Sequence, residues 1–151
     1  MAILQSPIKK KFESLVNQSN DEFDKGNHNE SITLLEEAWS VLPNPKGIYN
    51  ESYDLVNDII DTCFTVKDFK TAKKWSDKMF LTGFMRIDTG EKEFISGKVA
   101  YEFGDLEIAK EFFNFANKKS EGRCFEYEIR EYEEKHGDKA MEHMTLDAVI
   151  G

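Results

Sequence analysis

The strongest constraint on the fold is a pattern of small and large side chains that recurs along the chain. Its clearest copy lies between residues 97 and 116, where Gly104-Asp105 separates two stretches with helical spacing. Glycine readily takes the left-handed conformation that ends a helix, and aspartate caps the helix that follows. In the second stretch, small and large side chains fall on one side of a helix: Ala109, Phe113 and Ala116. The pattern predicts two helices joined by a very short turn.

A comparable turn occurs twice upstream, so that the three turns begin at positions 26, 67 and 104, which are 41 and 37 residues apart. After Gly26 the corresponding side chains are Ser31, Leu35 and Ala38, and after Lys67 they are Ala72, Ser76 and Met79. A period in this range, with two helices in each unit, is typical of helical solenoids. One aromatic residue also precedes each turn by three positions: Phe23, Phe64 and Tyr101.

Together these residues resemble the tetratricopeptide repeat, whose unit of about 34 residues is a helical hairpin. The units cover about residues 12–45, 53–86 and 90–123. The resemblance implies an all-α fold, a right-handed array of about three degenerate hairpins followed by C-terminal capping helices over about residues 121–150. We expect one domain that spans residues 1–151. The third unit matches the family best, through Gly97, Gly104, Leu106, Ala109, Phe113 and Ala116.

Capping residues and helix breakers place the helices along the chain. Ser6-Pro7 predicts the start of the first helix, and Pro43 ends the second. Asp68 and Asp105 are predicted N-caps, and Asp88 with Glu91 predicts a capping box. The predicted helices cover about residues 7–25, 30–42, 47–66, 69–81, 106–119 and 121–136, with one more from about residue 88 and a short one after residue 137.

The charge of the chain restricts its partners. The net charge of −9 disfavours nucleic acid and acidic membrane surfaces, because both attract basic proteins. It favours a basic protein as the partner, although acidity also serves solubility alone. The apolar run at the N-terminus is too short for a secretory signal, and no segment is long enough to cross a bilayer. We expect a cytoplasmic protein in which Cys63 and Cys124 are buried free thiols.

We find no pattern that predicts catalysis. The three histidines, His28, His136 and His143, have no nucleophile or metal ligand at a recognised spacing. The glycines are isolated, so no phosphate-binding loop is predicted. The sequence therefore predicts no catalytic residue, no metal ligand and no cofactor.

The resemblance does imply a binding surface, because the first helix of each tetratricopeptide unit lines a concave groove. In this register carboxylates surround one aromatic side chain in each unit, an arrangement that suits lysine and arginine side chains. Phe23, Phe64 and Tyr101 are alternatively core residues, and the carboxylates ordinary surface charge. The groove would also hold Glu13, Asn20, Phe23, Glu91 and Lys98. The candidate partner-binding residues are Asp24, Asp54, Asn57, Asp61, Phe64, Phe94, Tyr101, Glu102, and Glu128 in the acidic C-terminal segment.

We expect a non-enzymatic protein-binding module. In size and acidity the chain is similar to bacterial immunity proteins and antitoxins, which neutralise a basic toxin domain by direct binding. The alternative is a secretion chaperone or adaptor that holds an extended peptide in its groove. A chaperone of this kind would use the groove aromatics, whereas an inhibitor needs a folded partner and can use any face.

Overall fold

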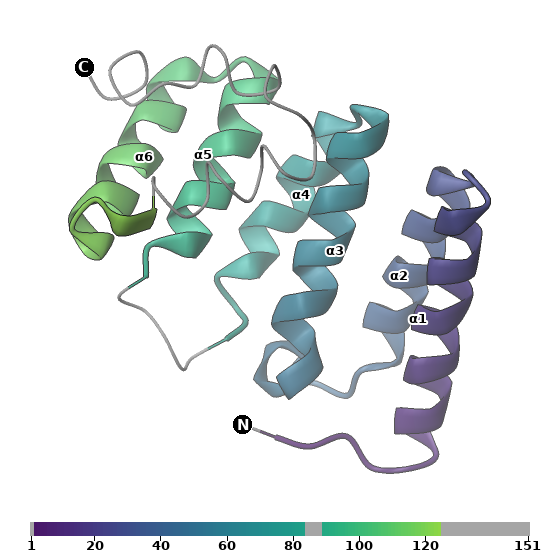
Figure 1. Ribbon diagram of the computed structural model, residues 1–151. Helices are drawn as coiled ribbons and strands as arrows, with labels where there is room; N and C mark the ends of the chain where they lie inside the picture. The colour runs from purple at the N-terminus through teal and green to yellow at the C-terminus, as the bar shows by residue number, and fades with distance from the viewer. Residues whose placement is uncertain (1, 84–88, 125–151) are drawn as a thin grey trace. The chain divides into compact units, whose positions relative to one another are not determined.

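Every regular element in the part of the chain that the structure describes is a helix (Figure 1). This computed structural model describes residues 2–83 and 89–124. The all-α prediction is confirmed for these residues, whereas the helices predicted after residue 124 lie outside them. The chain divides into two compact units, residues 1–84 and 85–151. The elements are α1 (Ile8–Asp24), α2 (His28–Val41), the 3₁₀ helix η1 (Lys46–Ile48), α3 (Asn50–Val66), α4 (Phe69–Met79), α5 (Glu91–Phe103) and α6 (Leu106–Ser120).

The three predicted turns have the same backbone conformation. A left-handed residue follows the first helix of each hairpin, with φ of 85° at Gly26, 60° at Lys67 and 95° at Gly104. Lysine takes this conformation in the middle turn at a steric cost that glycine avoids. The residue after it has φ between −93° and −86° and ψ between 63° and 74° in all three hairpins: Asn27, Asp68 and Asp105.

The hydrogen bonds of the three turns also match. In each turn a backbone N–H donates to the carbonyl five residues earlier, which closes the helix end with a Schellman-type bond. The three bonds are 2.9 Å long and run from Asn27 to Glu22, from Asp68 to Cys63 and from Asp105 to Ala100. The repeated turn that the sequence predicts is therefore present three times at the level of individual backbone atoms.

The side chains predicted on the inner side of each second helix are buried in all three hairpins. Small side chains there let the paired helices approach closely. In α1 and α2 the hydroxyl groups of Ser19 and Ser31 lie 2.7 Å apart and form a buried hydrogen bond. The buried residues at these equivalent positions are Ser31, Leu35 and Ala38 in α2, Ala72, Ser76 and Met79 in α4, and Ala109, Phe113 and Ala116 in α6.

In the first unit, α2 packs against both α1 and α3, and α3 packs against α4 (Figure 1). The rings of Trp39 in α2 and Trp75 in α4 meet edge to face, with 5.5 Å between their centroids. The indole N–H of Trp75 donates to the Glu36 carboxylate at 3.0 Å. This contact joins the second helices of the first two hairpins.

In the second unit, α5 packs against α6, and one residue pair at this contact fits especially closely. Gly97 lies against the ring of Phe113, which is fully buried and also meets Phe94 with 5.4 Å between ring centroids. Ala100, Ala109, Ala116 and Cys124 complete this small apolar core. Both cysteines of the chain are buried free thiols, as predicted.

The structure corrects three predicted helix starts. Pro7 is the N-cap of α1 rather than its first residue, since α1 begins at Ile8, and the Pro7 carbonyl accepts from the N–H of Lys11 at 3.2 Å. The prediction that one helix starts at residue 47 is wrong. Residues 46–48 form η1, and Tyr49 is extended beside Ala2, with which it forms an isolated β-bridge. The N-cap of α5 is the left-handed Gly90, and Asp88 lies outside the described residues.

The predicted caps at Asp68 and Asp105 are both at N-cap positions, but only one makes a side-chain bond. The Asp68 carboxylate accepts from the backbone N–H of Thr71 at 3.1 Å, whereas the Asp105 side chain forms no such bond. The second and fourth helices also end slightly earlier than predicted. α2 ends at Val41 rather than at about residue 42, and α4 ends at Met79 rather than at about residue 81. Helix ends commonly differ by one or two residues in this way.

Candidate functional site

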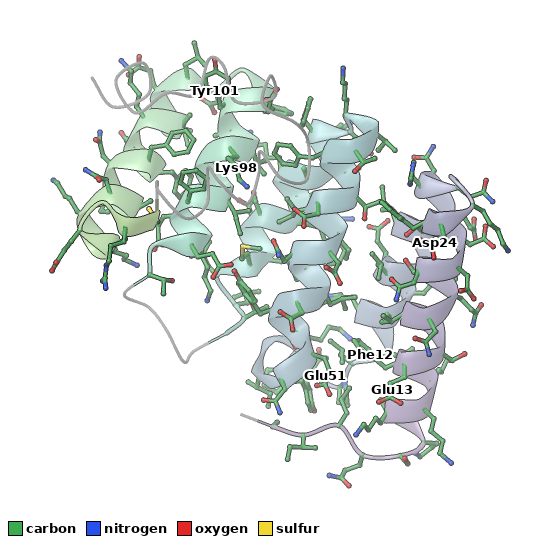
Figure 2. All side chains as sticks on the ribbon, in the orientation of Figure 1. Phe12, Glu13, Asp24, Glu51, Lys98 and Tyr101 are labelled. Carbon is green, nitrogen blue, oxygen red and sulfur yellow. The ribbon has the colours of Figure 1, made fainter. Side chains whose placement is uncertain are left out.

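The predicted polar residues of the first unit lie on α1 and α3. Asp24 is the exposed last residue of α1, and Glu13 lies in the first half of the same helix (Figure 2). Asp54 on α3 is exposed, and Asn57 and Asp61 are half-buried on the same helix. These side chains come from the first helices of two successive hairpins, as the register predicts.

Two of the predicted aromatic residues belong to the core. Phe64 has only 9% of its surface exposed, and its ring meets that of Phe69 with 5.3 Å between centroids. Phe94 has 1% exposed and packs against Phe113. Both rings are therefore core residues rather than surface residues. The sequence left this alternative open for Phe64, whereas the placement of Phe94 on the binding surface is corrected.

The aromatic residue before each turn has a structural partner after it in the first two hairpins. Phe23 meets His28 with 4.5 Å between ring centroids, and Phe64 meets Phe69 in the equivalent contact five residues further on. Phe23 differs from Phe64 in being 40% exposed. Because the same contact recurs at two turns, the repeated aromatic residue stabilises the hairpin turn in both.

In the second unit the predicted residues are less accessible. Tyr101 is half-buried against the core of this unit, and Glu102 is half-buried beside it in the sequence. Lys98 is buried, and its Nζ atom lies 5.4 Å from the centroid of the Phe94 ring. Lys98 and Tyr101 are both labelled in Figure 2. Glu128 lies outside the described residues, so the structure gives it no position.

One polar feature was missed by the sequence reasoning. Glu51 and Asp58 continue the series formed by Asp54 and Asp61, so that α3 carries four carboxylates at positions 51, 54, 58 and 61. Spacings of three and four residues place side chains on one side of a helix. Asp58 is exposed, and Glu51 is half-buried with its Oε2 atom out of contact with solvent. The spacing alone would have identified this row, which we call the acidic stripe of α3.

The described residues contain no cluster of ligands suited to a metal ion. Burial, together with the nearby Asp68 and Glu36 carboxylates, raises the pKa of the Cys63 thiol to about 12. A thiol with this pKa stays protonated near neutral pH and is a poor nucleophile. Cys63 is therefore a packing residue of the first unit.

No protein-family model matches this sequence, and no curated protein matches it at a significant level. The site has therefore to be interpreted from its own geometry and charge. In the part of the chain that the structure describes, no helix has both the length and the apolar character needed to cross a bilayer.

Proposed function

We propose that this chain is a non-enzymatic protein-binding module that holds a basic protein on the solvent-facing sides of α1 and α3. The observation that carries the proposal is the acidic stripe of α3. Its four carboxylates share one side of a helix that contains no lysine or arginine, in a chain of net charge −9. Asp24 and Glu13 add exposed carboxylates on α1.

Carboxylates grouped in this way suit a partner that presents lysine or arginine side chains. Each such pair is a charge-assisted hydrogen bond, stronger than a bond between neutral groups. The summed negative potential also steers a basic partner during its approach and disfavours acidic proteins. Charge complementarity therefore supplies both the speed and the selectivity of binding.

We infer that the binding is of the inhibitor type, like that of immunity proteins and antitoxins, rather than of the chaperone type. A chaperone groove of this register would grip a peptide with its repeated aromatic side chains. Phe64 is buried, and both Phe23 and Phe64 are engaged with partners across their turns. The exposed side chains of α3 are polar or acidic, which suits the charged surface of a folded protein.

The proposal includes the right-handed tetratricopeptide-like arrangement of the three hairpins. The identical turns at Gly26, Lys67 and Gly104 support it, as do the buried residues at equivalent positions after each turn. An array of this kind would present the first helices of its hairpins on one side, and with them the carboxylates of α1 and α3.

Affinity capture from a lysate of the source organism, followed by mass spectrometry, tests the function. The wild-type chain is expected to retain a basic protein in stoichiometric amount and to release it at high salt. A double variant, Asp54→Lys with Asp61→Lys, should lose it. The matched control, Glu37→Lys with Asp77→Lys, makes the same change of charge at exposed positions on α2 and α4 and should retain it. Equal retention by both variants would exclude α3 as the binding surface.

A further inference from the structure

Apolar side chains lie exposed along one side of α6 in the second unit. Ile108 and Phe115 have 44% and 58% of their surfaces exposed, and their separation of seven residues places them on the same side of the helix. Phe112 lies between them on this side and is half-buried. We call these three residues the apolar row of α6. Exposed apolar side chains that are grouped in this way are typical of surfaces that contact another protein.

The first two hairpins carry polar side chains at the positions equivalent to the two ends of this row. Counted from the left-handed residue of each turn, the equivalent residues are Glu30 and Glu37 in α2 and Thr71 and Lys78 in α4. Both glutamates are exposed. The three hairpins otherwise share their turns and their buried positions, so the apolar side chains at these positions are a particular property of α6. They indicate that this side of the helix is covered by another surface.

The charge of α6 is balanced, although the chain as a whole is strongly acidic. The charged residues of this helix are all exposed, and they are two glutamates and three lysines: Glu107, Lys110, Glu111, Lys118 and Lys119. Glu107 and Lys118 are about three helical turns apart, so they lie on one flank of the apolar row, one near each end. Neither forms an ion pair with another residue in the part of the chain that the structure describes.

We propose that the α6 helix of a second copy of this chain docks antiparallel on the apolar row of α6, in a two-fold symmetric contact. Ile108 of each copy then packs against Phe115 of the other, and Glu107 of each copy lies opposite Lys118 of the other. The row and its flanking charges are complementary to themselves in this arrangement, which favours a second copy over an unrelated occupant. The contact uses the second unit alone and does not depend on the proposed function.

The net charge of −9 on each copy opposes this association, so the contact has to be stabilised by the burial of apolar surface. At an ionic strength of about 0.15 M, charges more than about 8 Å apart are largely screened from one another, which weakens the repulsion between the two copies. Burial of apolar side chains does not depend on long-range attraction. The dimer is therefore expected to be weakest at low salt and to become more stable as salt is added.

Sedimentation of the purified full-length chain, over a range of concentrations, tests the inference. A dimer should form as the concentration rises at about 0.15 M salt, and it should form less readily at about 0.01 M salt, where screening begins only beyond about 30 Å. The double variant Ile108→Thr with Phe115→Gln keeps the net charge and should remain monomeric. The matched control, Ile3→Thr with Leu81→Gln, removes two exposed apolar side chains from the first unit and should associate like the wild type. Circular dichroism confirms that each variant is folded.

Charge reversals beside the apolar row test the antiparallel arrangement. Glu107→Lys and Lys118→Glu should each raise the Kd of the dimer about fivefold, because each places like charges opposite one another at both ends of the contact. The two reversals combined in one chain should restore the affinity of the wild type. A wild type that stays monomeric at every salt concentration would overturn the inference, and this is the result expected if residues 125–151 of the same chain, or an unrelated protein, cover the row instead. Association of the apolar double variant, or a combined reversal that does not recover, would overturn it as well.

Discussion

Gly97 on α5 lies so close to Phe113 on α6 that a methyl group at Gly97 would be 2.8 Å from the ring. The ring cannot easily move away, because it is fully buried and packed against Phe94. The absence of a side chain at one residue therefore sets the separation of the two helices in the second unit.

Gly97→Ala is expected to destabilise the second unit. Overpacking in a core costs about 1–3 kcal/mol, and the higher helix propensity of alanine returns up to about 1 kcal/mol. We therefore expect a net loss of about 1 kcal/mol in the free energy of unfolding, measured by urea titration with far-UV circular dichroism. Lys110→Ala, at an exposed site on α6, is the control and should have little effect. A stabilised Gly97→Ala variant would show that the helices do not pack this closely.

Lys67→Gly should stabilise the first unit. Lysine at a φ of 60° bears a conformational cost of about 1–2 kcal/mol, and glycine removes it while adding about 0.4–1 kcal/mol of unfolded-state entropy. The expected gain in the free energy of unfolding is about 0.5–1 kcal/mol. The fluorescence of Trp39 and Trp75, which lie in the same unit, measures it. Gly26→Ala makes the opposite change at the equivalent turn and should lose about 1 kcal/mol. The changes in the free energy of unfolding should therefore have opposite signs in the two variants. A loss of stability in both would contradict the left-handed conformation that the two turns share.

The caps at the second and third turns should differ in strength. Asp68→Ala removes a side-chain hydrogen bond to Thr71 and should cost about 1 kcal/mol. Asp105→Ala removes no such bond and should cost less, because only the charge at the helix N-terminus is lost. Thermal unfolding of the two variants beside the wild type measures the difference. Equal losses would mean that Asp105 caps α6 through its side chain in solution.

The thiol of Cys63 should make stability fall at alkaline pH. Burial holds its pKa at about 12 in the folded chain, against an ordinary value of 9.0. Between these values the unfolded chain releases the proton and the folded chain keeps it, so stability decreases as pH rises. This contribution is fully present below pH 9.0. Urea titrations at several alkaline pH values should give a shallower decline for Cys63→Ala than for the wild type, and identical declines would refute the assignment.

The sequence was informative about the turns because their chemistry is local. Gly26 and Gly104 supply the left-handed residue directly, and Lys67 could be placed through its spacing from the other two turns and the capping Asp68. The buried positions after each turn follow from helical periodicity. These features depend on residues close together in the chain, so the pattern was sufficient.

Other features depend on distant residues and could not be predicted in the same way. Tyr49 is extended because it pairs with Ala2, a contact across 47 positions of the sequence. Gly90 begins α5 where a methyl group would lie 2.6 Å from the carbonyl oxygen of Ala116. Phe23 and Phe64 occupy equivalent positions but differ in exposure, because periodicity fixes the side of a helix and not what covers it. The acidic stripe, by contrast, follows from the spacing of the carboxylates in α3, of which the sequence analysis names only Asp54 and Asp61.

The most direct test of the central claim is the affinity of the captured partner for the wild type and for the Asp54→Lys, Asp61→Lys variant, measured by isothermal titration at low salt. If the acidic stripe of α3 holds a basic protein, the variant should bind at least about tenfold more weakly, a loss of about 1.4 kcal/mol, while its unfolding curve stays unchanged. The Glu37→Lys, Asp77→Lys control should bind like the wild type. Equal affinity of all three chains would contradict the account and place the binding surface elsewhere.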